Sequence, residues 1–215
     1  SEKECSITYS VSFCYFFRNE KNLLIKKMKN IVITSAKRTP IGKFMGGFGS
    51  LSAIELGALV LAEIIKDSKL TKDQIDEVIL GQVLTGGSGQ NPARQTSCLT
   101  NIPDSKSALT INQVCGSGLR AISLGAQSIM TGQSDIVLAG GQESMSNAHH
   151  TANLRNGIKM GDGQMKDSMI IDGLWCAMND YHMGITAENV AEKYKINKDQ
   201  QDQFAANSQI KAEKA

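Results

Sequence analysis

Short apolar segments alternate with longer amphipathic ones between Ile31 and Gly141, and this alternation limits the chain to few folds. Apolar residues recur at helical spacing from Leu51 to Ile65, which predicts an amphipathic helix there. Pro92 is suited to the first turn of a second helix, and a third is expected from Gly116 to Met130. Strands are expected over residues 31–33, 78–83, 108–111 and 135–139, with a helical turn capped by Thr71. This order predicts an α/β fold with a largely parallel sheet.

The pattern changes near residue 145. From Met145 to Tyr181 the chain is polar and rich in Gly and Met, without a clear period. An irregular stretch of this length is usually functional or an insertion. Two helices are expected to follow, one capped by Thr186 over residues 187–194 and one over residues 198–214, where Asn197 and Gln200 form a variant of the capping box.

The composition excludes several classes of function. A formal net charge of +2 indicates neither nucleic acid nor an acidic surface as a partner. The five cysteines are widely spaced, and none lies at zinc spacing with another cysteine or a histidine, so we expect no metal, no disulfide framework and a reducing, cytoplasmic compartment. Gly86–Gln90 lacks the Lys-Ser/Thr that completes a phosphate-binding loop. No apolar run is long enough to span a bilayer.

Residues 1–27 differ in character from the rest. They hold an apolar and aromatic run, Ser6–Phe17, which follows acidic residues and lacks a signal peptide's basic start and small-residue cleavage site. Met28 opens a segment that would serve as a natural start. We therefore expect residues 1–27 to be an extension outside the fold, the alternative being a membrane-associating or partner-binding tail. The final helical pattern lacks a C-cap, so the chain looks cut rather than finished.

The strongest chemical signal is Cys115, which lies at a predicted strand-to-helix turn with Gly116 directly after it and Gly118 close by. The positive end of a helix dipole favours thiolate over thiol, and N–H groups at the helix start are expected to point at the sulfur. The same groups could stabilise a thioester oxyanion. The two glycines allow a tight turn and close approach of a substrate. The alternative, a buried structural cysteine, fits this turn less well.

The segment VCGSGLRA around Cys115 resembles the nucleophile motif of thiolases. Further segments resemble thiolases in the family's own order: TSAKRTPIGKFMGGF, GQNPARQ, LAGGQESMSNA, LRNGIKMGD, YHMGITAENVA and DQFAANSQIKA. The resemblance runs from Met28 to Ala215 and is greatest to the biosynthetic branch, the acetyl-CoA acetyltransferases. It implies the N-terminal half of a thiolase fold, a βαβαβαββ core over residues 28–144, followed by the truncated beginning of a loop domain over residues 145–215.

The resemblance also implies a reaction. In thiolases the cysteine takes an acyl group from coenzyme A, and a second acetyl-CoA attacks the resulting thioester, or the reverse thiolysis occurs. Coenzyme A thioesters are the substrates, and no separate cofactor is implied. The nucleophile role falls on Cys115. His182 and Met183 are expected beside the pantetheine and acyl pocket, and Leu174 near the coenzyme. For His182 a hydrogen-bonded structural role stays open.

This chain departs from the family in one large respect. A complete thiolase has a second, similar half that supplies the activating histidine, an asparagine and a second cysteine, and no matching motifs occur here. Cys98 and Trp175-Cys176 are smaller departures. We expect the chain alone to be inactive in condensation. Two interpretations stay open: an acyltransferase whose second half lies on another chain, and an inactive remnant or non-enzymatic acyl-CoA- or partner-binding module.

The resemblance further implies self-association, since thiolases of this branch are typically tetramers built from dimers. Residues 147–167 resemble the loop that joins dimers, and Gln90, Asn91 and Arg94 resemble a segment near the dimer contact. Without a second half, the helix at residues 116–130 would expose an apolar face. The implied partners are therefore acetyl-CoA, acetoacetyl-CoA, further copies of the chain and a complementary C-terminal half.

Overall fold

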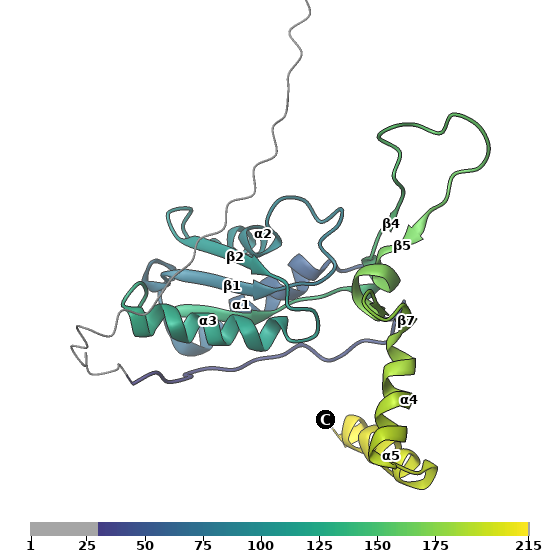
Figure 1. The fold of residues 1–215 in the computed structure, drawn as a ribbon. Coiled ribbons are helices and arrows are strands. Elements are labelled where there is room, and N and C mark those ends of the chain that lie inside the picture. The colour runs from purple at the N-terminus through teal and green to yellow at the C-terminus, as the bar shows by residue number, and fades with distance from the viewer. Residues whose placement is uncertain (1–29, 215) are drawn as a thin grey trace, which may run out of the picture. The chain divides into compact units, whose positions relative to one another are not determined.

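The computed structural model describes residues 30–214, so the extension expected at residues 1–27 lies outside it. At its centre three parallel strands pair in the order β2-β1-β3, with β1 over Glu77–Gly81, β2 over Ser107–Ile111 and β3 over Val137–Gly141 (Figure 1). Gly81 pairs with both Ile111 and Gly141. The three strands thus end level with one another, which confirms the predicted α/β fold and brings the segments that follow them to one edge.

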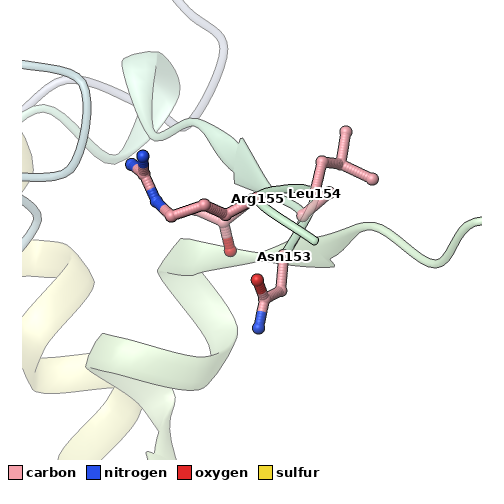
Figure 2. A pocket seen from close by; sticks show the side chains of 5 residues that line it. Asn153, Leu154 and Arg155 are labelled. Carbon is pink, nitrogen blue, oxygen red and sulfur yellow. The ribbon is translucent and has the colours of Figure 1, made fainter. Parts of the chain in front are cut away.

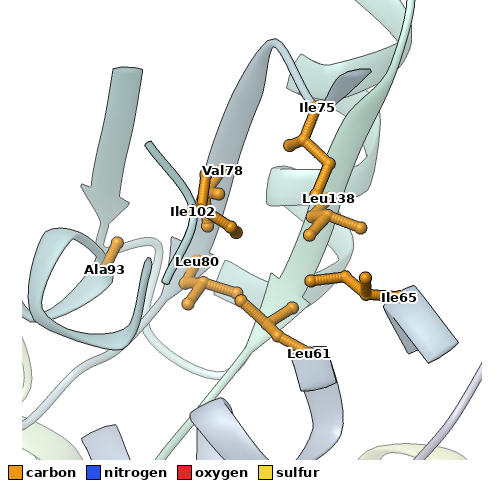
Figure 3. Packing of buried hydrophobic residues seen from close by; sticks show 8 residues of the cluster. All are labelled: Leu61, Ile65, Ile75, Val78, Leu80, Ala93, Ile102 and Leu138. Carbon is orange, nitrogen blue, oxygen red and sulfur yellow. The ribbon is translucent and has the colours of Figure 1, made fainter. Parts of the chain in front are cut away.

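One face of this sheet carries the hydrophobic core. Val78, Leu80 and Leu138 pack with Leu61 and Ile65 of α1 (Ala53–Ser68) and with Ala93 of α2 (Pro92–Leu99), as Figure 3 shows. Ser52 and Glu55 form a capping box that begins α1. Thr71 and Gln74 do the same for the 3₁₀ turn η2 (Lys72–Gln74). The predicted helices and caps are confirmed here.

The other face of the sheet carries α3 (Ser117–Thr131). Because side chains alternate along a strand, the residues between the core positions of β1 and β3 point toward α3. Close packing confirms this: a Cβ built on Gly125 would lie 3.1 Å from Val137, and one on Gly81 would lie 2.5 Å from the Cβ of Ser117. The sheet is therefore covered by α1 and α2 on one side and by α3 on the other.

The outer face of α3 is apolar and open within the described chain. Leu119 is 76% exposed, and Ile122 and Met130 are also exposed. This confirms the expectation that the helix leaves an apolar face without cover among residues 30–214.

Beyond β3 the chain forms short elements rather than a layer. They are the 3₁₀ turn η3 (Met145–Asn147), the hairpin strands β4 (His150–Thr151) and β5 (Lys166–Asp167), the π-helical η4 (Met169–Leu174), the strands β6 (Trp175–Cys176) and β7 (Tyr181–His182), and the helices α4 (Met183–Tyr194) and α5 (Lys198–Lys214). Asn197 and Gln200 exchange hydrogen bonds of 2.9 and 3.0 Å, which confirms the predicted cap of α5. The division at residue 145 stays a prediction.

Two predictions of local structure are wrong. Residues 31–33 form no strand, and Val32 and Ile33 are 73% and 76% exposed. They pair with neither edge of the sheet in the described chain, and an apolar run without a neighbouring strand gains neither hydrogen bonds nor burial. In addition, Thr186 does not cap α4. The helix begins earlier because the Nδ1 of His182 accepts a hydrogen bond from the Gly184 N–H at 3.0 Å.

Among the helices of residues 30–214, none combines the length and the apolar character that crossing a membrane requires.

Candidate active site

Cys115 lies in the tight turn that joins β2 to α3. The residue before it, Val114, has a φ of 48°. This left-handed backbone is a genuine outlier for a β-branched residue. Asn112 Oδ1 accepts a hydrogen bond from the Val114 N–H at 2.8 Å, and Ser117 Oγ donates to the Val114 carbonyl at 2.6 Å. The turn presents an exposed cysteine beside the level ends of the strands.

The first N–H groups of α3 are used within this turn. The Gly116 N–H donates to the Gln113 carbonyl at 3.1 Å, and the Ser117 N–H donates to the Val114 carbonyl at 3.1 Å. The prediction that N–H groups at the helix start point at the sulfur is therefore wrong for these two. Gly116 is therefore part of the turn, but its N–H group is not free to bind the sulfur or an oxyanion.

Three glycines bring α3 close to the strand ends. A Cβ on Gly81 would lie 2.8 Å from the Gly118 nitrogen, and one on Gly141 would lie 3.3 Å from the Gly118 Cα. Contacts this short leave no space for side chains between the backbones. The start of α3 is thus pressed against β1 and β3, which fixes where the turn with Cys115 lies.

A cavity of about 340 Å³ opens beside Cys115. Its lining comes from the segments after β1, β2 and β3 and from η4, and includes Leu84, Val114, Met145, Gly173 and Leu174. Most of this lining is apolar. The structure therefore brings together three of the predicted site residues, Cys115, Gly118 and Leu174, in the wall of this cavity.

His182 and Met183 do not line this cavity. His182 is exposed and caps α4, in line with the structural role that the sequence left open for it. Met183 is partly buried, and its sulfur accepts a hydrogen bond of 4.0 Å from the Thr186 hydroxyl.

Sequence reasoning missed Glu143, which also lines the cavity. Its carboxylate accepts hydrogen bonds from the Val83 N–H at 2.8 Å and the Leu84 N–H at 3.3 Å. Burial raises the pKa of Glu143, and these N–H groups oppose that rise. Its position four residues after the strand predicted over residues 135–139, at the edge where Cys115 also falls, was the available signal.

A buried polar cluster, two of whose members line the cavity, lies in its wall. Gln142 Nε2 donates to Gln82 Oε1 at 3.0 Å, and the Thr96 hydroxyl donates to Gln142 Oε1 at 2.8 Å. Gln82 Nε2 in turn donates to the Leu84 carbonyl at 3.0 Å. Since unpaired buried amides are costly, this network fixes the loop after β1 that forms one wall.

The other two cysteines within residues 30–214 have different surroundings. Asn179 Nδ2 donates to the Cys176 sulfur at 3.1 Å, and this bond, together with the Asn179 and Met178 N–H groups, lowers the pKa of the Cys176 thiol. The Cys98 thiol is exposed and lies 3.9 Å from Asp104 Oδ1. No group of His, Cys, Asp and Glu side chains in residues 30–214 is arranged to hold a metal ion.

A second hollow, of about 640 Å³, lies along Thr151–Arg155, with Asn153 and Arg155 beside it in Figure 2. It shares no residue with the cavity at Cys115. It falls within residues 147–167, which the sequence associates with subunit contacts.

Comparison with known proteins identifies the family. Residues 31–215 match the family described as "Thiolase, N-terminal domain". The chain belongs to the thiolase family. Among curated thiolases, the acetyl-CoA acetyltransferase of Allochromatium vinosum is 57% identical over 188 residues, which cover 87% of this chain and 48% of that protein. That of Paracoccus denitrificans is 55% identical over the same shares.

A solved thiolase is also similar. The crystal structure of Acat5 thiolase from Ascaris suum in complex with coenzyme A matches with a TM-score of 0.79 and 44% identity, over 83% of this chain and 46% of that one. This confirms that the described fold is that of a thiolase. The chain spans about half the length of the thiolases it matches.

Proposed function

We propose that this chain provides the nucleophile of a thiolase that condenses two molecules of acetyl-CoA to acetoacetyl-CoA, or runs the reverse thiolysis. The observation that carries the proposal is the placement of Cys115 on a strained turn at the mouth of a largely apolar cavity. Relatives at 52–57% identity are named acetyl-CoA acetyltransferase, probable acetyl-CoA acetyltransferase or, in one case at 52%, probable acetyl-CoA acyltransferase, and the first two names support acetyl-CoA as substrate.

The first half of the reaction uses the thiol that this turn presents, and the activating histidine that the resemblance implies would come from the second half. The Cys115 thiolate attacks the thioester carbonyl of acetyl-CoA, and coenzyme A leaves as a thiolate that takes up a proton. The product is an acetyl group bound to the Cys115 sulfur. The acetyl methyl would lie against the apolar wall of Leu84, Met145 and Leu174.

The second half needs a base that removes a proton from the methyl group of a second acetyl-CoA. The carbanion then attacks the acetyl carbonyl, and the Cys115 sulfur leaves. Within the described chain, Cys115 and Glu143 are the only ionisable residues that line the cavity. We assign this base to a complementary C-terminal half, for which the open apolar face of α3 offers a contact surface.

The other site residues keep the roles that the resemblance implies. Leu174 would lie near the coenzyme, and His182 and Met183 beside its pantetheine arm. Gly116 and Gly118 would shape the turn that admits the thioester. The only ligands in this proposal are coenzyme A thioesters, with no metal or separate cofactor.

We also propose a tetramer in the cytoplasm. The assembly would use the loop of residues 147–167 between dimers and the segment with Gln90, Asn91 and Arg94 near the dimer contact. A reducing compartment suits a reaction that depends on a free thiol at Cys115.

The experiment is acetylation of the purified 215-residue chain by acetyl-CoA, followed by peptide mass spectrometry. We expect the acetyl group on the peptide that contains Cys115, and no acetyl group there in Cys115→Ala. Cys176→Ser is the matched control and should be acetylated at Cys115 at the rate of the parent. Acetylation spread over Cys98 and Cys176, without preference for Cys115, would contradict the proposal.

One observation favours a second candidate, a module that binds acyl-CoA or a partner without turnover. The described lining of the cavity contains no histidine, although a thiolase cycle requires proton transfer. Binding of coenzyme A by the Cys115→Ala variant, together with an absence of acetylation in the parent, would favour this candidate.

A further inference from the structure

The turn before Cys115 holds an unfavourable conformation that its neighbours must impose. Val114 has a φ of 48°, and its branched side chain makes this backbone costly. A residue keeps such an unfavourable backbone conformation only where surrounding contacts hold it there. The question is which contacts do so.

Two side chains hold both polar groups of the Val114 backbone. Asn112 Oδ1 accepts from the Val114 N–H at 2.8 Å. Ser117 Oγ donates to the Val114 carbonyl at 2.6 Å and accepts from the Gln113 N–H at 2.8 Å. Because the peptide unit is planar, fixing the Val114 carbonyl also fixes the plane that leads into Cys115.

Ser117 is itself buried and closely packed against β1. It is 4% exposed, and it lies so close to β1 that a Cβ on Gly81 would be only 2.5 Å from the Ser117 Cβ. The hydroxyl that binds the turn is therefore anchored to the centre of the sheet. The position of Cys115 is therefore fixed by contacts with the central strand β1.

We infer that Ser117 and Asn112 are positioning residues, which keep Val114 left-handed and so direct Cys115 at the thioester in the cavity. This inference rests on the proposed role of Cys115 as the acylated nucleophile. Ser117 lines the cavity, but its hydroxyl is taken up by the Val114 carbonyl and the Gln113 N–H, so in this role it would act through Cys115 rather than on the substrate. Its removal should affect acyl transfer, which needs geometry, more than the general reactivity of the thiol.

The test compares two reactions of one thiol in the 215-residue chain. In Ser117→Ala we expect acetylation of Cys115 by acetyl-CoA to slow by on the order of tenfold, since a misplacement of about 1 Å can cost about a hundredfold. Alkylation of Cys115 by iodoacetamide, which needs no bound geometry, should stay within about twofold, that is within about 0.4 kcal/mol. Asn112→Ala should likewise slow acetylation of Cys115 and leave its alkylation almost unchanged.

Two further variants separate positioning from loss of stability. Ser128→Ala removes another buried serine of α3, which bonds Ser134 and Glu77 rather than the turn, and should leave both reactions of Cys115 unchanged. Val114→Gly removes the steric cost of the left-handed backbone. In that background Ser117→Ala should slow acetylation much less than it does in the parent.

Hydrogen exchange of the peptide that covers residues 112–117 gives a readout independent of acetylation. We expect faster exchange there in Ser117→Ala, and parent-like exchange in Ser128→Ala. Unchanged exchange in Ser117→Ala, or equal slowing of acetylation and alkylation, would overturn the inference. A parent chain that exchanges slowly in this peptide but accepts no acetyl group would instead overturn the proposed function.

Discussion

At the scale of single residues, the three described cysteines differ in what surrounds the sulfur. Cys176 receives hydrogen bonds from Asn179 and the nearby backbone, which lower the pKa of its thiol. Cys115 lies on a strained turn beside a cavity. The surroundings that favour a thiolate are therefore seen at Cys176, and the cavity is seen at Cys115.

Asn179→Ala tests the first property. The largest contribution to the lowered pKa of Cys176 is the hydrogen bond from the Asn179 side chain, so its loss should raise that pKa toward the ordinary value. Since the thiolate is the nucleophile, alkylation of Cys176 near neutral pH should slow by a few fold. Peptide-resolved labelling measures it, with Cys98 in the same molecule as the reference. Unchanged labelling of Cys176 would mean that the bond does not control its ionisation.

At the scale of secondary structure, contacts between backbones decide where α3 lies. Gly81→Ala should destabilise the fold by about 1–3 kcal/mol, the usual cost of overpacking, because the new methyl meets the backbone of Ser117 and Gly118. Gly140→Ala is the matched control, since a Cβ there meets no atom within 4 Å. Urea unfolding compares the two. Equal midpoints would show that α3 can shift away from β1 at little cost.

A carboxylate links the segments that lead into β1 and β3, and we expect the stability of the fold to depend on pH through it. Asp76 accepts hydrogen bonds from the Asp135 N–H at 2.8 Å and the Ile136 N–H at 3.0 Å, and these bonds lower its pKa below the model-compound value of 3.8. A lowered folded-state pKa means stability that is present above the unfolded pKa and lost as pH falls through the folded one.

Asp76→Asn should therefore be less stable than the parent at pH 7, with a difference that shrinks as the pH falls below about 4. Thermal or urea unfolding of the parent and the variant between pH 7 and about pH 3 measures this difference. Asp73→Asn, on the preceding turn, is the control that removes a nearby carboxylate and keeps both hydrogen bonds that Asp76 accepts. A gap between parent and Asp76→Asn that stays constant down to about pH 3 would contradict the linkage.

The helices and strands of the core could be predicted because their signals are local. Ser52 with Glu55, and Asn197 with Gln200, are caps that need only neighbouring residues. Cys115 was also singled out by local residues, the glycines that follow it, and the structure places it at the cavity, while its chemical role stays a prediction. The strand expected at residues 31–33 failed because pairing depends on a partner distant in sequence.

The missed parts of the site have the same cause. Glu143 binds the Val83 and Leu84 N–H groups across 59 to 60 positions of sequence. The buried amide pair Gln82 and Gln142 is likewise formed only when β1 and β3 lie side by side. The cap by His182 was missed for another reason, because histidine is not among the preferred N-cap residues.

At the scale of the whole molecule, the cavity of the described chain is lined by Cys115, the proposed nucleophile, and by no other ionisable residue than Glu143. We expect the 215-residue chain alone to form no detectable acetoacetyl-CoA, since general-base assistance contributes about 10² to 10⁴-fold. A coupled assay of acetoacetyl-CoA at high protein concentration measures it. Addition of a separately expressed C-terminal half of a related thiolase should restore turnover, and turnover comparable to a full-length thiolase without it would refute the assignment.

The strand order β2-β1-β3 has a bearing on how the chain is made. On the ribosome β1 emerges first and has two empty edges. β2 follows and fills one edge, and β3 then fills the other, each delivered by its own helical crossover. No strand has to be inserted between two that are already paired. The sheet can therefore grow outward from its centre in the order of translation, without reopening earlier pairings.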